Sequence, residues 1–101
     1  MSVVTELTPD GQKLTIVISG RFDYAKHQGF RESYENLQPK PKSFEVNLKD
    51  ATYLDSSALG MLLLLRDHAG GDKADIKLSH ASADVRKILA ISNFVKLFNV
   101  S

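Results

Sequence analysis

Apolar and polar residues alternate with a period of two in two stretches of this chain, which is the pattern of a β-strand with one buried face. Residues 13–19 and 43–49 show this alternation, and apolar residues at 3–7 indicate an edge strand before them. Asp10-Gly11 separates the first two strands and favours a hairpin, because both residues tolerate a positive φ. The residues expected to face the core are Leu14, Ile16, Ile18, Phe44, Val46 and Leu48.

Two central stretches have the spacing that is typical of helices. Phe30, Tyr34 and Leu37 recur at i, i+4 and i+7, and Asp23 is placed to cap the segment that follows it. Residues 59–65 carry leucines on every side, so we expect a helix that is buried around most of its circumference.

The last part of the chain predicts a short strand, a third helix and an apolar end. Residues 75–79 have the composition of a strand, and Ser82 can cap the helix that follows. Residues 94–100 form either a strand or a short helix. The inner stripe of the third helix is expected to consist of Val85, Ile88 and Leu89.

This order of elements predicts an α/β fold in a single domain, residues 1–101, with a mixed central sheet packed against helices. The N-terminal hairpin makes the first strand antiparallel, and the strand–helix units that follow demand right-handed parallel crossovers. Loops after parallel strands gather at the carboxyl edge, where open α/β sheets place their sites. Asp23 and Asp55-Ser56 both follow such strands, so we expect them to be neighbours in space.

A polar triplet, Asp55-Ser56-Ser57, stands between a short strand-like segment at 52–54 and the leucine-rich helix. A helix start collects unpaired backbone N–H groups and the positive end of the helix dipole. Asp55 or Ser56 can be a cap and nothing more, which is the common role of such residues. The helix start could also hold a phosphate on Ser56. This second interpretation is supported by the number of polar residues, because a helix needs one cap and three polar residues stand here. The residues alone leave both interpretations open.

Composition and motifs exclude several classes of function. The formal net charge is +1 and the basic residues are spread along the chain, so no nucleic-acid partner is predicted. The chain has no cysteine, and His27, His68 and His80 lie on separate elements without ligand spacing, so no metal or cofactor is expected. Nucleotide-binding loops and the hydrolase and metalloprotease motifs are absent from the sequence.

The expected location is the cytoplasm. The residues after Met1 show no basic segment followed by an apolar one, as a signal peptide would. The longest unbroken apolar run, 61–65, is far shorter than the roughly 20 residues that span a bilayer, so no membrane association is predicted.

The segment from Tyr53 to Gly60, Tyr-Leu-Asp-Ser-Ser-Ala-Leu-Gly, resembles the phosphoacceptor motif of STAS domains, and more narrowly that of bacterial anti-sigma factor antagonists. Residues 18–23 are similar to that family's second strand and loop, and residues 85–94 to its third helix. Ala58 stands where many members have glycine, which a helix tolerates because alanine is the better helix former. The resemblance implies a STAS-type single domain.

The resemblance also implies roles for single residues. Ser56 matches the serine that an anti-sigma factor or a related switch kinase phosphorylates. Asp55 matches the acid before it, Ser57 the neighbouring hydroxyl residue that supports the site, and Asp23 the acidic loop residue of the partner surface. In the family, the unphosphorylated form binds the anti-sigma factor, phosphorylation abolishes binding, and a metal-dependent serine phosphatase restores it. The implied function is a phospho-switched binding module.

Two other functions are compatible with such a fold. The protein can be a constitutive STAS subunit of a transporter or other complex, in which Ser56 is only a cap. An enzyme with Ser56 as nucleophile is disfavoured, because the element order places no histidine nearby to act as base. We therefore expect a binding protein and not an enzyme.

Overall fold

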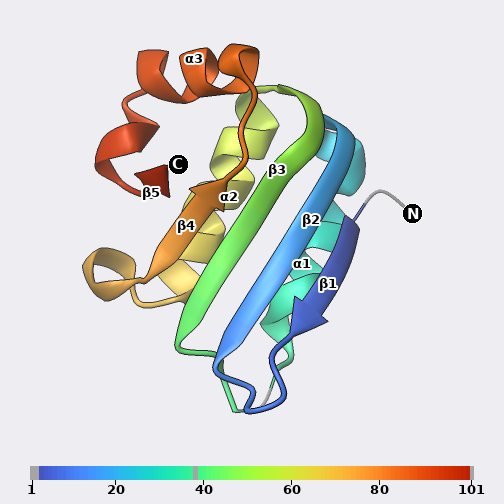
Figure 1. Cartoon of the computed structure of the whole chain (residues 1–101), viewed down its shortest axis with the longest axis vertical. Helices are drawn as coiled ribbons and strands as arrows, with labels where there is room; N and C mark the ends of the chain where they lie inside the picture. The colour runs from blue at the N-terminus through green and yellow to red at the C-terminus, as the bar shows by residue number, and fades with distance from the viewer. Residues whose placement is uncertain (1–2, 38, 101) are drawn as a thin grey trace.

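A computed structural model describes residues 3–37 and 39–100 and shows five strands in one mixed sheet, ordered β1-β2-β3-β4-β5 (Figure 1). β1 pairs antiparallel with β2, and every later neighbour is parallel, as expected for a hairpin followed by strand–helix units. The strands are β1 (Val3–Leu7), β2 (Lys13–Phe22), β3 (Ser43–Leu54), β4 (Ile76–Ser79) and β5 (Asn99–Val100). The predicted α/β fold is confirmed.

The helices α1 (His27–Glu35) and α2 (Ser56–His68) lie together behind the sheet in the view of Figure 1. Strands β2, β3 and β4 follow one another in space as in sequence, so right-handed crossovers put α1 and α2 on the same face of the sheet. The third helix, α3 (Ala83–Ile91), crosses the end of the sheet at the top of that view. Three short 3₁₀ turns complete the fold: η1 (Tyr24–Lys26), η2 (Gly71–Lys73) and η3 (Phe94–Lys96).

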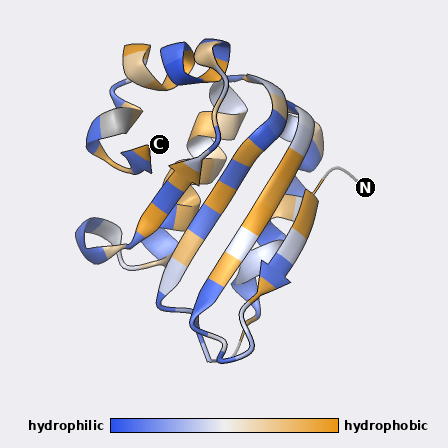
Figure 2. Cartoon of the chain, in the orientation of Figure 1, coloured by the Kyte–Doolittle hydropathy of each residue, from blue (hydrophilic) through white to orange (hydrophobic). Residues whose placement is uncertain are grey.

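The core lies between the sheet and the helices. Hydrophobic and hydrophilic residues alternate along β2 and β3 (Figure 2), and all six residues expected to point inward from these strands are buried. Ser82 accepts a hydrogen bond from the Val85 N–H at 3.2 Å, which confirms it as the cap of α3. The segment at 94–100 contains both of the predicted alternatives, the turn η3 and then β5.

Strand β3 is longer than the sequence pattern predicts. It is one strand of 12 residues, whereas the alternation indicated a strand at 43–49 and a separate short segment at 52–54. Its pairing with β2 shifts register twice, from Val17↔Asn47 to Ser19↔Asp50 and from Gly20↔Ala51 to Arg21↔Tyr53. Each shift gives β3 one residue more than β2 over the same length, so the strict alternation of inward and outward residues is lost. The period-two pattern therefore did not predict that the strand continues beyond residue 49 to Leu54.

The prediction that α2 is buried around most of its circumference is wrong. Ala58, Met61, Leu62 and Leu65 face the core, but Leu63 and Leu64 are 40% and 54% exposed. Because α2 packs against only one side of the sheet, its outer leucines meet solvent. Hydrophobic residues on every side of a helix need a second layer to bury them, and within the described residues no such layer covers this side of α2.

Replacing leucines on the two sides of α2 tests this arrangement. We expect Leu62→Ala to lower the free energy of unfolding by about 2–5 kcal/mol, because a fully buried side chain is removed and a cavity remains. The matched variant Leu64→Ala should change it by less than about 1 kcal/mol. Urea unfolding of both variants measures the difference, and equal losses would contradict the one-sided burial of α2.

Candidate functional site

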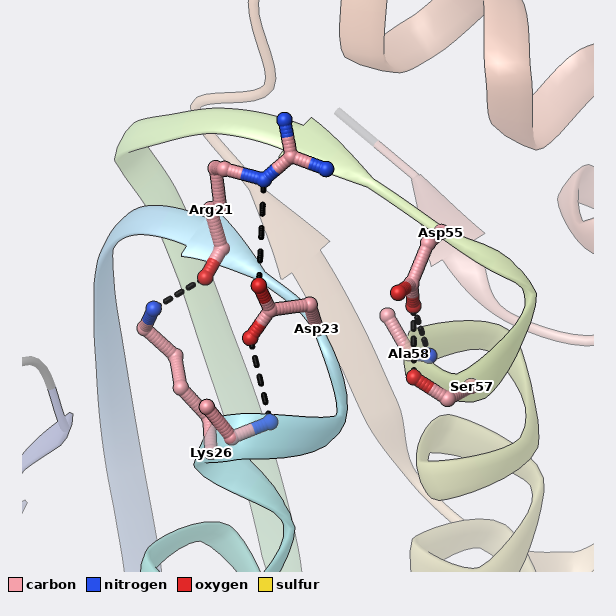
Figure 3. Close-up of polar contacts among 7 residues, drawn as sticks. Arg21, Asp23, Lys26, Asp55, Ser57 and Ala58 are labelled. Atoms are coloured by element: carbon pink, nitrogen blue, oxygen red, sulfur yellow. Dashed lines mark hydrogen bonds and ion pairs between the residues drawn. The ribbon is translucent and has the colours of Figure 1, made fainter.

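The loops after β2 and β3 lie side by side at the carboxyl edge of the sheet (Figure 3). Phe22 and Leu54 end the two strands as a register pair, and the Asp55 N–H donates to the Phe22 carbonyl at 3.3 Å. This bond continues the strand pairing one residue into the loop. The prediction that Asp23 and Asp55-Ser56 are neighbours in space is therefore confirmed.

Asp55 is the N-cap of α2. Its carboxylate accepts hydrogen bonds from the Ala58 N–H at 2.9 Å and from the Ser57 hydroxyl at 2.6 Å (Figure 3). The Ser57 hydroxyl, followed by the Ala58 backbone N–H, lowers the pKa of the Asp55 carboxyl, and the charge of Arg21 adds a smaller effect in the same direction. Asp55 thus remains a carboxylate at the positive end of α2.

Ser56 is the first residue of α2 and its side chain is exposed. In the part of the chain that the structure describes, its hydroxyl has no hydrogen-bond partner. Asp55 does the capping and Ser57 supports Asp55, so the triplet is not a set of three redundant caps. Of the two hydroxyls in the triplet, that of Ser56 is the one without a hydrogen bond to the described residues.

Asp23 belongs to the neighbouring loop and caps the turn η1, not α1 itself. Its carboxylate accepts a hydrogen bond from the Ala25 N–H at 3.1 Å. The same side chain forms an ion pair with Arg21, in which Nε and Oδ2 are 3.7 Å apart (Figure 3). The Lys26 ammonium donates to the Arg21 carbonyl and ties η1 back to the end of β2.

Two exposed aromatic residues and one arginine join the predicted residues at this edge. The Arg21 guanidinium lies 5.0 Å from the centroid of the Tyr53 ring, and Tyr24 is 71% exposed and stacks on His27. Sequence reasoning assigned no role to these side chains. Tyr53 follows both register shifts in β3, so its position opposite Arg21 could not be read from the alternating pattern.

The edge is a surface and not an enclosed cavity. Two surface hollows are present on the helices, one along α1 and one between α1 and α2, and none of the predicted site residues lines either. Among residues 3–37 and 39–100, no three or more acidic or histidine side chains come close enough to hold a metal ion. No helix in the same range is long and apolar enough to cross a membrane. Charged and aromatic groups on an open surface suit protein recognition.

Comparison with known proteins agrees with this geometry. The family described as Mlab, STAS domain matches residues 5–99, which is nearly the whole chain. The chain belongs to the STAS-domain family. A STAS-domain containing protein of Pseudomonas aeruginosa (strain UCBPP-PA14) is 58% identical over 101 residues, with all of both chains covered.

Two kinds of solved STAS structure share the fold. The anti-sigma factor antagonist SpoIIAA in its unphosphorylated form is 17% identical with a TM-score of 0.79, and 98% of this chain and 87% of that one are covered. The phosphorylated form of the Bacillus SpoIIAA is also 17% identical, with a TM-score of 0.74 and coverage of 98% and 90%. The SulP transporter STAS domain of Vibrio cholerae is 22% identical with a TM-score of 0.68, covering 83% and 68%. At these identities the likeness shows the fold alone.

The capping role of Asp55 predicts a pH-dependent loss of stability. Its folded pKa lies below the value of about 3.9 for an unfolded chain, so its charge stabilises the fold above that pH and ceases to do so as the pH falls through the folded pKa. Asp55→Ala should therefore unfold at a lower urea concentration than the wild type at pH 7. This gap between the two urea midpoints should narrow below about pH 4. Asp67→Ala removes a carboxylate from the same helix without removing a cap, and should show no such gap. A gap that is constant with pH would contradict the role of the charge.

Proposed function

We propose that this protein is an anti-sigma factor antagonist, a binding module that is switched by phosphorylation of Ser56. In its unphosphorylated form it sequesters an anti-sigma factor or a related switch kinase in the cytoplasm. Asp23, Asp55, Ser56 and Ser57 form the partner-binding surface, and a metal-dependent serine phosphatase resets the switch. The observation that carries the proposal is the free, exposed hydroxyl of Ser56 beside two carboxylates that hold the loops in place.

The switch requires only group transfer to and from Ser56. The kinase transfers the γ-phosphoryl group of a nucleoside triphosphate to Ser56 Oγ, which loses its proton, and the nucleoside diphosphate leaves. Water then hydrolyses the phosphate ester on the phosphatase, which returns the serine hydroxyl and inorganic phosphate. The antagonist itself supplies an acceptor and no catalytic group, in keeping with a binding protein.

A phosphate on Ser56 would change the electrostatics of the edge without unfolding it. The group adds a charge of about −1.5 to −2 beside Asp55 and the loop of Asp23. The N-terminal end of α2 tolerates this charge, because its dipole and its backbone N–H groups favour anions. A partner that places acidic groups or a closely packed surface against Ser56 would be repelled. Charge repulsion and lost packing therefore act together.

The structures that share the fold are compatible both with this proposal and with a constitutive role. SpoIIAA, which shares the fold, is described as an anti-sigma factor antagonist in its unphosphorylated form and as a Bacillus cell fate determinant in its phosphorylated form. The V. cholerae transporter domain shares the fold as well, so the fold alone fits a constitutive subunit of a larger complex. The hydroxyl that remains free at the start of α2 favours the switch, because a constitutive subunit needs only the cap.

Phosphorylation of single-residue variants identifies the acceptor. On incubation with the cognate kinase and a nucleoside triphosphate, we expect wild type and Ser57→Ala to gain one phosphate at Ser56 and Ser56→Ala to gain none. Peptide mass spectrometry locates the group. Phosphate at another residue of the wild type would contradict the proposed acceptor, and Ser57→Ala controls for disturbance of the cap.

Binding to the anti-sigma factor tests the switch itself. We expect Ser56→Asp to bind about 5- to 150-fold more weakly than wild type, the usual range of coupling between a switch and a binding site. In Ser56→Asn the new side chain has nearly the same shape as aspartate but no charge. Its affinity, measured by titration calorimetry, should stay within a few-fold of the wild-type value. Equal binding by wild type, Ser56→Ala and Ser56→Asp would favour the constitutive subunit instead.

A further inference from the structure

The Arg21 side chain is held at the site by contacts that are easily exchanged. Its Nε lies 3.7 Å from the Asp23 carboxylate, which is beyond normal hydrogen-bond length, and the side chain is 65% exposed. Its second contact is the face of the Tyr53 ring. An exposed ion pair of this length contributes little to stability, so the guanidinium can leave it at little cost.

The strand pairing puts this mobile cation close to the phosphate acceptor. Arg21 is the register partner of Tyr53, and Ser56 follows Tyr53 by three residues at the same edge of the sheet. The charge of Arg21 already acts on Asp55, the residue directly before Ser56. Ser56 is exposed, so a phosphate on its Oγ would lie in solvent at this edge. Arginine is the longest cationic side chain that could meet it there.

We propose that Arg21 is the intramolecular sensor of phosphorylation: once Ser56 carries a phosphate, the Arg21 guanidinium leaves Asp23 and pairs with the phosphate oxygens. This inference rests on the proposed function, because it describes what the phosphorylated state does at the same site. The exchange changes the edge in two places. It frees the Asp23 carboxylate from its cation, and it withdraws the guanidinium from the Tyr53 ring.

The chemistry of the two anions favours the exchange. A phosphate monoester carries nearly twice the charge of a carboxylate near neutral pH and offers three oxygens, so it matches the planar fork of a guanidinium with two hydrogen bonds. Lysine cannot reproduce that fork. Lys26 is another cation of this edge, but its ammonium already donates to the Arg21 carbonyl. Of these two cations, Arg21 can move with the smaller loss of structure.

The pKa of the phosphate itself reports whether Arg21 pairs with it. Phosphoserine inserted at position 56 during translation removes any need for a kinase, and ³¹P NMR over a pH titration follows the second ionisation. A neighbouring cation favours the dianion and lowers that pKa. We expect Arg21→Gln to raise the phosphate pKa by about half a unit relative to the unsubstituted phosphoprotein, an effect reduced by solvent screening. Molar salt should reduce the difference further.

Arg31→Gln is the matched control. Arg31 is also an exposed arginine paired with a carboxylate, that of Glu35, so its removal changes the net charge by the same amount. It lies beside Leu64, eight residues along α2 from Ser56 and therefore about 12 Å further down the helix. We expect Arg31→Gln to leave the phosphate pKa unchanged within about a tenth of a unit. Urea unfolding verifies that each variant is folded.

The outcomes separate this inference from the proposed function. A raised phosphate pKa in Arg21→Gln but not in Arg31→Gln supports the sensor, and Arg21→Lys should restore only part of the wild-type value. The same pKa in wild type, Arg21→Gln and Arg31→Gln overturns it, even if the kinase modifies Ser56 and the anti-sigma factor is released. If the kinase leaves Ser56 unmodified while the pKa responds to Arg21, the proposed function fails and the pairing stands.

Discussion

The parallel pairing of β2 with β3 is the interaction on which the rest of the molecule depends. It forms the centre of the sheet and carries the inward-facing residues of both strands into the core. It also runs on to Phe22 and Leu54 and, through the Asp55 N–H, into the loop beyond. A single ladder therefore builds the core and fixes the distance between the loops after β2 and β3. Disturbing that ladder would change the stability of the fold and the geometry of these loops together.

At the start of α2, adjacent residues of the polar triplet differ in what they contribute to the structure. Asp55 satisfies the helix N–H groups, and Ser57 orients and stabilises the Asp55 carboxylate. Ser56 stands between them and has neither task within the described residues. A side chain placed in this way can be modified without removing the cap. On the proposed function, the cap would remain when Ser56 gains a charge, as a reversible switch requires.

Much of this could be predicted from the sequence, because local patterns and chain order carry it. The hairpin, the parallel units and the meeting of Asp23 with Asp55 follow from alternation, turn residues and the handedness of crossovers. What failed depended on tertiary context. Whether Leu64 is buried is decided by the number of layers around α2, and leucine spacing does not encode that number. The contact of Arg21 with the Tyr53 ring depends on the register between β2 and β3. The pattern of apolar residues within one strand does not contain that information, and it does not show the ion pair of Arg21 with Asp23 either.

The two register shifts in β3 have a consequence for how such a site diversifies. If β3 continued in the Val17↔Asn47 register without the two shifts, Arg21 would lie opposite Ala51, and Tyr53 would lie beyond the end of the pairing. The pairing of Arg21 with Tyr53 at this edge is therefore set by the two shifts. A chain that keeps both shifts keeps this pairing whatever the outward side chains are. On the proposed function, single substitutions of those side chains would change the preference for partners without rebuilding the fold beneath them.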